Sequence, residues 1–210
     1  MIGMNPFSYI DYAKVRLKTE KLKKENPTLN SAELAQILIR SNAYKCAVLG
    51  VTVALPAVVP GFGTALAFIG GIVVDITVLG YLLSNLILEI AALYNRNLEA
   101  KDTIREAVWV FSMAIGSDIV GRGLSKTVVA RLSAGTYVSL LRKLFWMLGT
   151  KVTRKSVFSR VIPLIGSMVA GVVNYTTAGL IGRRALKYYQ DNSVDSWDGV
   201  TLDAEYKVVD

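Results

Sequence analysis

Two long stretches with almost no charge constrain the fold of this chain more than any other feature. Residues 46–88 contain a single charged side chain, Asp75, and residues 161–182 contain none. Apolar and polar residues do not alternate in either stretch, so a half-buried strand is not indicated. Runs of this length predict helices that are buried in protein or in lipid.

Prolines and charges mark the expected ends of these two helices. Pro60 and Gly61 predict a turn before a helix over about residues 62–94, and Pro163 opens a helix over about residues 162–189. Shorter segments rich in Lys and Arg have the periodicity of amphipathic helices. The expected fold class is all-α: a single helical domain with two long central apolar helices, wrapped by shorter amphipathic helices.

Capping patterns predict where two other helices begin. Asn5 stands before a proline, which is typical of an N-cap followed by the first helical residue. Asn30 and Glu33 have the spacing of a capping box, in which each side chain bonds the backbone N–H of the other residue. We therefore expect one helix to begin after Asn5 and the next after Asn30.

Charge is unevenly placed along the chain, whose formal net charge is +8. We expect a basic amphipathic N-terminal helix in residues 1–26, an all-α domain in residues 27–190 and an acidic flexible tail in residues 191–210. A basic, apolar body favours an anionic membrane lipid or a membrane protein as the partner. No nucleic acid is expected, because nucleic-acid-binding proteins rarely carry so much uninterrupted apolar sequence.

Each long helix has a line of small residues at steps of four, interrupted by one polar residue. Residues four apart share one helix face, and small residues there let two backbones approach closely. We therefore expect the two long helices to pack on each other, with Asn174 donating a hydrogen bond to Asp75. The lines are Gly63, Ala67, Gly71 and Asp75 in the first helix, and Gly166, Ala170, Asn174, Ala178 and Gly182 in the second.

Asp75 is the centre of the candidate binding site, because a carboxylate among apolar residues needs partners or a proton. Three interpretations stay open: a buried structural hydrogen bond, a functional contact with a ligand or ion, and exposure to solvent. Basic residues elsewhere in the chain would supply compensating charge. The candidate binding residues are Asp75, Asn174, Arg122, Lys126, Arg183 and Arg184.

The placement of the two apolar helices also stays open. They are long enough to cross a bilayer, but glycine and threonine dilute their hydrophobicity, and Asp75 lies where charge is expensive. The alternatives are peripheral or conditional insertion at the inner face of the cell membrane, permanent spanning, and burial in a soluble core. The basic N-terminal helix supports attachment to anionic lipid.

Residue types that serve many catalytic sites are missing. The chain has no histidine, which removes the usual general base near neutral pH. Cys46 is the single cysteine, so a reducing compartment is the simplest setting. The glycine-rich segment 116–123 lacks the Lys and Ser/Thr of a phosphate-binding loop, and no acidic cluster has metal-ligand spacing. We therefore expect no enzymatic activity, no cofactor and no metal.

Two groups of motifs stand out over roughly residues 31–190. The central motif is the turn from Pro56 to Gly63, followed by the small-residue helix that contains Asp75. The C-terminal motif comprises Pro163, Gly166, Asn174, Tyr175, Gly182, Arg183, Arg184, Tyr188 and Tyr189. Together they resemble the EcsC family of bacterial proteins. The C-terminal motif is the more specific one, because Pro, Gly, Asn-Tyr and Gly-Arg-Arg recur together at set spacings.

One position departs from the family pattern. Asn95 follows Tyr94 where a glycine is expected, so the turn after the first long helix is expected to differ. The resemblance implies a bacterial, cytoplasm-facing protein. The family takes its name from an operon that encodes an ABC transporter, and it supplies no catalytic residues.

Three functions remain as hypotheses. The first is a non-catalytic, membrane-associated accessory protein on the cytoplasmic side of a bacterial membrane, which binds lipid or a protein partner and is linked to an ABC transporter. The second is a membrane-inserting helical effector or pore-former. The third is a lipid-acting enzyme that uses Asp75, although no nucleophile–base pair is recognisable.

Overall fold

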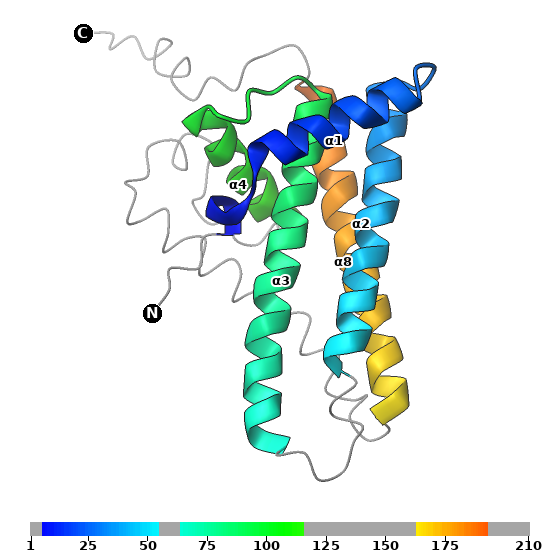
Figure 1. Ribbon diagram of the computed structural model, residues 1–210, viewed down its shortest axis with the longest axis vertical. Coiled ribbons are helices and arrows are strands. Elements are labelled where there is room, and N and C mark those ends of the chain that lie inside the picture. The colour runs from blue at the N-terminus through cyan, green and yellow to red at the C-terminus, as the bar shows by residue number, and fades with distance from the viewer. Residues whose placement is uncertain (1–5, 55–63, 116–162, 193–210) are drawn as a thin grey trace, which may run out of the picture.

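A computed structural model shows the chain as a bundle of helices (Figure 1). The structure describes residues 6–54, 64–115 and 163–192, and every regular element in these ranges is helical. This confirms the predicted all-α class. The elements are a 3-10 helix, Pro6–Tyr9, and the α-helices α1, Tyr12–Glu25; α2, Ser31–Ala54; α3, Thr64–Leu93; α4, Lys101–Ile115; and α8, Pro163–Asp191.

Three long helices, α2, α3 and α8, lie side by side and determine the shape of the bundle (Figure 1). α2 runs in the opposite direction to α3 and α8. α1 crosses the upper part of α3, near the end where α2 begins, and α4 packs beside α3 and α8 in the same upper region. The upper end of the bundle is therefore covered by short helices, whereas the three long helices continue alone below it.

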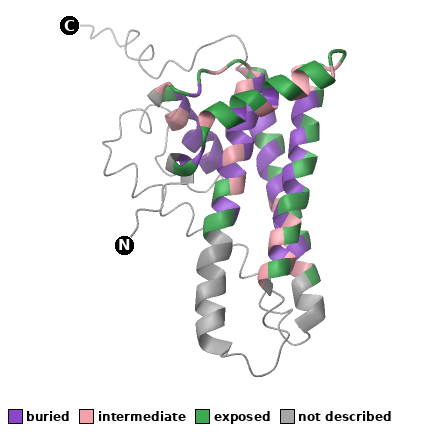
Figure 2. Cartoon of the chain, viewed as in Figure 1, coloured by how far each residue is buried: buried purple, intermediate pink, exposed green. Residues whose placement is uncertain are grey.

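The core lies between the inner faces of the long helices and under α4 (Figure 2). Buried residues run almost without a break from Leu83 to Leu93 of α3, as expected for a helix packed on several neighbours. The largest fully buried side chains of α3 are Leu79, Leu83, Leu86, Ile87, Leu88, Ile90 and Leu93.

The observed architecture differs from the expected one in its central layer. The prediction placed two apolar helices at the centre, but α2 is a third long helix and shares that position with α3 and α8. The predicted shorter helices between α4 and α8 lie outside the described residues, as does most of the predicted acidic tail. Within the described ranges, no helix combines the length and the apolar character that crossing a bilayer requires.

The capping box at the start of α2 is confirmed. The Glu33 side chain accepts from the Asn30 backbone N–H at 2.8 Å, and Oδ1 of Asn30 accepts from the Glu33 backbone N–H at 3.0 Å. The expected start of the first helix was wrong: the segment after Asn5 forms a short 3-10 helix, and Asp11 caps α1 instead. Oδ1 of Asp11 accepts from the Lys14 backbone N–H, which satisfies a donor that the helix itself leaves open.

The turn after α3 ends the helix at a left-handed residue. Asn95 has a φ of 60°, in the left-handed region that glycine adopts most easily and that asparagine tolerates. The Arg96 N–H bonds the Ala91 carbonyl and the Asn95 N–H bonds the Ala92 carbonyl, which is the Schellman pattern of helix termination. Asn95 therefore takes a conformation that suits glycine, while the expected difference from the family's turn stays a prediction.

The line of small residues on α8 contacts α2. A Cβ built on Gly50 of α2 would lie 2.7 Å from the carbonyl oxygen of Ala170 and 2.7 Å from the side-chain nitrogen of Asn174, both on this line. α8 makes its most extensive contact with α2 and a smaller one with α3, where a Cβ on Gly182 would meet Leu86. The expected pairing with the small-residue line of α3 stays a prediction, because the side chains of that line lie outside what the structure describes.

Candidate functional site

The lower end of the bundle is almost free of charge. The helix ends at Ala54, Thr64 and Pro163 lie together there (Figure 1). We define the apolar end as residues 46–54, 64–80 and 163–174. The only charged residue in these segments is Asp75.

Much of the described surface of the apolar end is apolar and open to solvent. Met168 is 68% exposed and Val172 is 63% exposed, one helical turn apart on α8. Val48 on α2 and Val78 on α3 are exposed as well. Single apolar residues on a surface are ordinary, but a set of them at one end of a molecule marks an interaction site.

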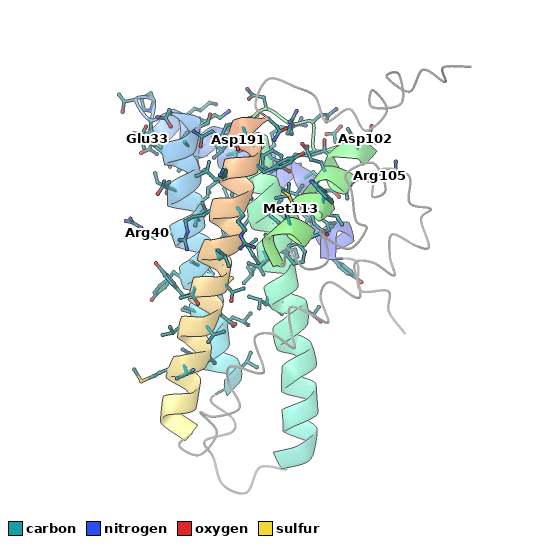
Figure 3. The ribbon with its side chains drawn as sticks, turned by 180° about the vertical axis from the view of Figure 1, so that it is seen from behind. Glu33, Arg40, Asp102, Arg105, Met113 and Asp191 are labelled. Carbon is teal, nitrogen blue, oxygen red and sulfur yellow. The ribbon has the colours of Figure 1, made fainter. Side chains whose placement is uncertain are left out.

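The opposite end carries the charges. The labelled residues Glu33, Arg40, Asp102, Arg105 and Asp191 all lie in the upper part of the bundle (Figure 3). Several are exposed, and on α1 the exposed Lys14 pairs with the N-cap Asp11 and Lys21 pairs with Glu25. Polarity therefore changes along the long axis of the bundle, from a charged upper end to an apolar lower end.

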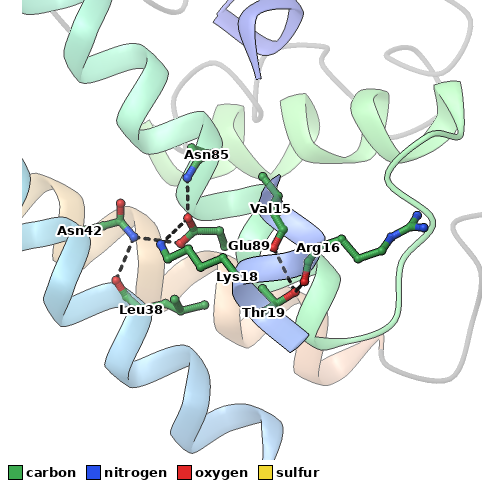
Figure 4. A network of polar contacts seen from close by, with 8 residues as sticks. All are labelled: Val15, Arg16, Lys18, Thr19, Leu38, Asn42, Asn85 and Glu89. Carbon is green, nitrogen blue, oxygen red and sulfur yellow. Dashed lines mark hydrogen bonds and ion pairs between the residues drawn. The ribbon is translucent and has the colours of Figure 1, made fainter. Parts of the chain in front are cut away.

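A buried carboxylate joins three helices at the upper end (Figure 4). Glu89 of α3 is 1% exposed, and Lys18 of α1 forms an ion pair with its Oε1. Asn85 donates to the same oxygen, and Asn42 of α2 donates to Oε2 at 3.1 Å. Both oxygens of this carboxylate have hydrogen-bond donors. The cluster therefore holds α1, α2 and α3 together and has a structural role.

A second buried carboxylate, Glu106 of α4, lies against α8. The Arg96 guanidinium is 3.4 Å from Oε1 of Glu106, and the Tyr188 hydroxyl donates to the same oxygen at 3.2 Å. Burial raises the pKa of Tyr188, and the neighbouring Glu106 carboxylate raises it further. Burial also raises the pKa of Tyr189, which packs edge-on to Tyr188 and stacks on Tyr94. Both tyrosines are held neutral, as fixed parts of the core.

The sequence did not single out Glu89 or Glu106. One signal was available for Glu89, which directly follows the apolar stretch and shares a helix face with Leu86 and Leu93. Glu106 similarly stands directly before the apolar segment 107–111 of α4. Within the described ranges, no group of acidic or cysteine side chains has the arrangement of a metal site.

The predicted binding residues are dispersed. Arg184 donates to the carbonyl oxygens of Met113 and Ala114, near the C-terminal end of α4, where it satisfies acceptors that the helix leaves open. Arg183 is exposed on α8. Arg122 and Lys126 lie outside the described residues, and Asp75 lies in α3 with its side chain outside what the structure describes.

Asn174 is the predicted site residue with the most unusual surroundings. It is 1% exposed in the contact between α8 and α2, opposite Gly50. Neither its amide nitrogen nor its amide oxygen has a hydrogen-bond partner among the contacts that the structure describes. The expected hydrogen bond to Asp75 stays a prediction.

Comparisons with known proteins add no further constraint, since no family model, no curated protein and no solved structure matches the chain. The resemblance to the EcsC family rests on the motifs in the sequence alone.

Proposed function

We propose that this protein is a non-catalytic accessory protein that binds the cytoplasmic face of a bacterial membrane, and that its apolar end enters the lipid. The observation that carries the proposal is the near absence of charge from this end of the bundle, where Asp75 is the only charged residue of the sequence and several apolar side chains are exposed. Met168, Val172, Val48 and Val78 are all exposed at the apolar end. Transfer of such surface from water into lipid stabilises the bound state by about 25 cal/mol per Å².

Positive charge beside the apolar end favours an anionic membrane. Lys45 and Arg40 on α2 and Arg183 on α8 are exposed between the apolar end and the upper region. Each Lys or Arg near an anionic leaflet contributes about 1 kcal/mol of attraction.

The two buried carboxylates support a structural role rather than a catalytic one. Glu89 accepts from three donors, and Glu106 has an arginine and a tyrosine beside it. A general acid or base must exchange its proton with a substrate, so it needs an approach path that these interior positions do not offer. The resemblance to the EcsC family adds the proposal that the membrane system involved includes an ABC transporter.

Co-sedimentation with lipid vesicles tests the proposal. We expect the purified protein to bind vesicles that contain about 30% anionic phospholipid. The double variant Met168→Asp/Val172→Asp should reduce binding at least about tenfold, because two charges would enter the hydrocarbon. The matched control Gln36→Asp/Gln190→Asp adds the same charge to exposed positions at the upper end, and it should bind nearly as well as the wild type.

Two results would count against the proposal. The first is an absence of binding to both anionic and neutral vesicles. The second is equal loss of binding in the two double variants, which would indicate a general charge effect rather than insertion of the apolar end. Release of an entrapped dye from the vesicles would favour the membrane-inserting effector instead.

A further inference from the structure

Three exposed tyrosines lie next to the apolar end, one on each long helix. Tyr44 on α2 is 67% exposed, Tyr175 on α8 is 43% exposed and Tyr81 on α3 is 37% exposed. In each helix the tyrosine stands within two residues of the segment that we defined as the apolar end. The sequence spacing of these residues gives no sign that they are related.

The packing of the three helices places these tyrosines at one level. A Cβ built on Gly182 of α8 would lie 2.6 Å from Ile39 of α2 and 3.2 Å from Leu86 of α3. These three residues therefore lie at about the same height, meaning the same position along the long axis of the bundle. Tyr44 and Tyr81 are each five residues below that height, or about 7.5 Å at 1.5 Å per residue. Tyr175 is seven residues below it, or about 10 Å. The three tyrosines, one on each long helix, therefore lie within about 3 Å of the same height.

Among the described side chains, exposed charge ends at this level, although apolar residues such as Ile37 and Leu180 are exposed above it too. Arg40 and Arg183 are exposed above it, near the height of Gly182. Val48, Val78 and Val172 are exposed below it. A tyrosine has an apolar ring and a polar hydroxyl, so it is most stable where an apolar medium meets water.

We propose that Tyr44, Tyr81 and Tyr175 form an aromatic belt at the level of the lipid headgroups, and that this belt sets the depth to which the apolar end enters an anionic membrane from one side. This inference rests on the proposed function and adds the orientation and depth of the bound protein. The long axis of the bundle stands upright on the membrane, with α1 and α4 away from it.

The lengths of the three helices below the belt agree with insertion from one side without crossing the bilayer. From the belt to the helix end, α2 extends about 15 Å, α8 about 18 Å and α3 about 25 Å. The hydrocarbon core of a bilayer is about 30 Å thick, so one leaflet contributes about 15 Å. The end of α2 thus reaches the midplane, and the end of α3 passes it without reaching the opposite headgroups.

Lys45 distinguishes lipid from a second copy of the chain as the occupant of this surface. It is exposed at the height of the belt, next to Tyr44. Lysine is depleted in protein–protein interfaces, where its charge loses water without gaining a partner. At a membrane surface, its chain lies along the apolar region while the ammonium group reaches the anionic headgroups.

Depth measurement by spin labelling tests the belt. Single cysteines replace Tyr44, Tyr81, Tyr175, Met168 or Gln36 in a Cys46→Ala background, whose fold is checked by circular dichroism. On vesicles with about 30% anionic lipid, labels at the three belt positions should report one depth, at the headgroups. A label at position 168 should lie about 10 Å deeper, and a label at position 36 should stay in water.

A second measurement needs no label and covers the case in which the Cys46→Ala background is unstable. The triple variant Tyr44→Ser/Tyr81→Ser/Tyr175→Ser should weaken vesicle binding about tenfold or more, because three interfacial rings are lost. Tyr9→Ser is the matched control, since Tyr9 is exposed in the 3-10 helix of the upper region. Its binding should stay within about twofold of wild type.

The outcomes separate the inference from the proposed function. If the wild type binds vesicles but the belt labels lie in water or as deep as position 168, the belt is wrong and membrane binding stands. Unchanged binding of the triple variant also overturns the belt alone. Failure of the wild type to bind any vesicle overturns both, as does a stable dimer in solution in which labels at the belt positions are buried.

Discussion

Gly50 of α2 faces Asn174 of α8 so closely that a Cβ on Gly50 would lie 2.7 Å from the side-chain nitrogen of Asn174. The same Cβ would lie 2.7 Å from the carbonyl oxygen of Ala170. No side chain fits at position 50 without separating the two helices. This contact sets the distance between α2 and α8 over the apolar end.

Gly50→Ala should therefore lower the free energy of unfolding. Overpacking against a backbone carbonyl costs about 1–3 kcal/mol, more than the gain of about 1 kcal/mol that alanine brings to a helix interior. Urea unfolding followed by circular dichroism measures the change. Gly179→Ala is the matched control, because its Cβ would meet only the flexible end of Arg183, at 3.2 Å. A Gly50→Ala variant as stable as Gly179→Ala would contradict the close contact.

Asn174→Ala distinguishes the observed contact from the pairing that the sequence suggested. If the Asn174 amide is buried without a partner, its removal relieves a desolvation cost of about 1–3 kcal/mol, and the variant should be as stable as the wild type or more stable. If Asn174 instead bonds Asp75, the variant should lose stability. A double-mutant cycle with Asp75→Ala, measured by urea unfolding, separates the two, since only a bonded pair shows a coupling energy.

Glu89→Ala should be among the most damaging substitutions at the upper end. It leaves Lys18, Asn42 and Asn85 without their shared acceptor, and breaking a buried ion pair costs about 3–5 kcal/mol. Glu99→Ala removes the partner of Arg16 in a largely exposed pair and should cost under about 1 kcal/mol. The thermal unfolding midpoints of the two variants show how much the Glu89 cluster stabilises the packing of α1, α2 and α3. Equal midpoints in the two variants would show that the cluster contributes little.

The turn after α3 should accept glycine and resist other residues. Asn95→Gly keeps the left-handed conformation without strain, so its stability should match the wild type within about 0.5 kcal/mol. Asn95→Ala introduces a residue that strains at this φ, with an expected cost of about 1 kcal/mol. Chemical denaturation of both variants measures the difference. A loss in the glycine variant larger than in the alanine variant would mean that the contact of Asn95 with Lys23 dominates instead.

Local features of the fold could be predicted from the sequence because the interacting groups are neighbours in the chain. The capping box of Asn30 and Glu33 is such a feature, since its bonds join residues three positions apart. The low charge of residues 46–88 and 161–182 also anticipated where the apolar end lies. The displaced start of the first helix shows the limit, because Asn5 and Asp11 are both good caps and packing of Phe7 in the core selects the second.

The sequence by itself determined that this protein is helical and that its charge is separated from its apolar segments, because helix periodicity, caps and composition depend on adjacent residues. Only the tertiary structure decided that α8 packs on α2, that Glu89 meets Lys18 and Asn42, and that Tyr44, Tyr81 and Tyr175 share one height. Each of these depends on the relative sliding of helices far apart in the chain. An apolar or small-residue face specifies that a helix packs closely, but not which helix it meets or at what register.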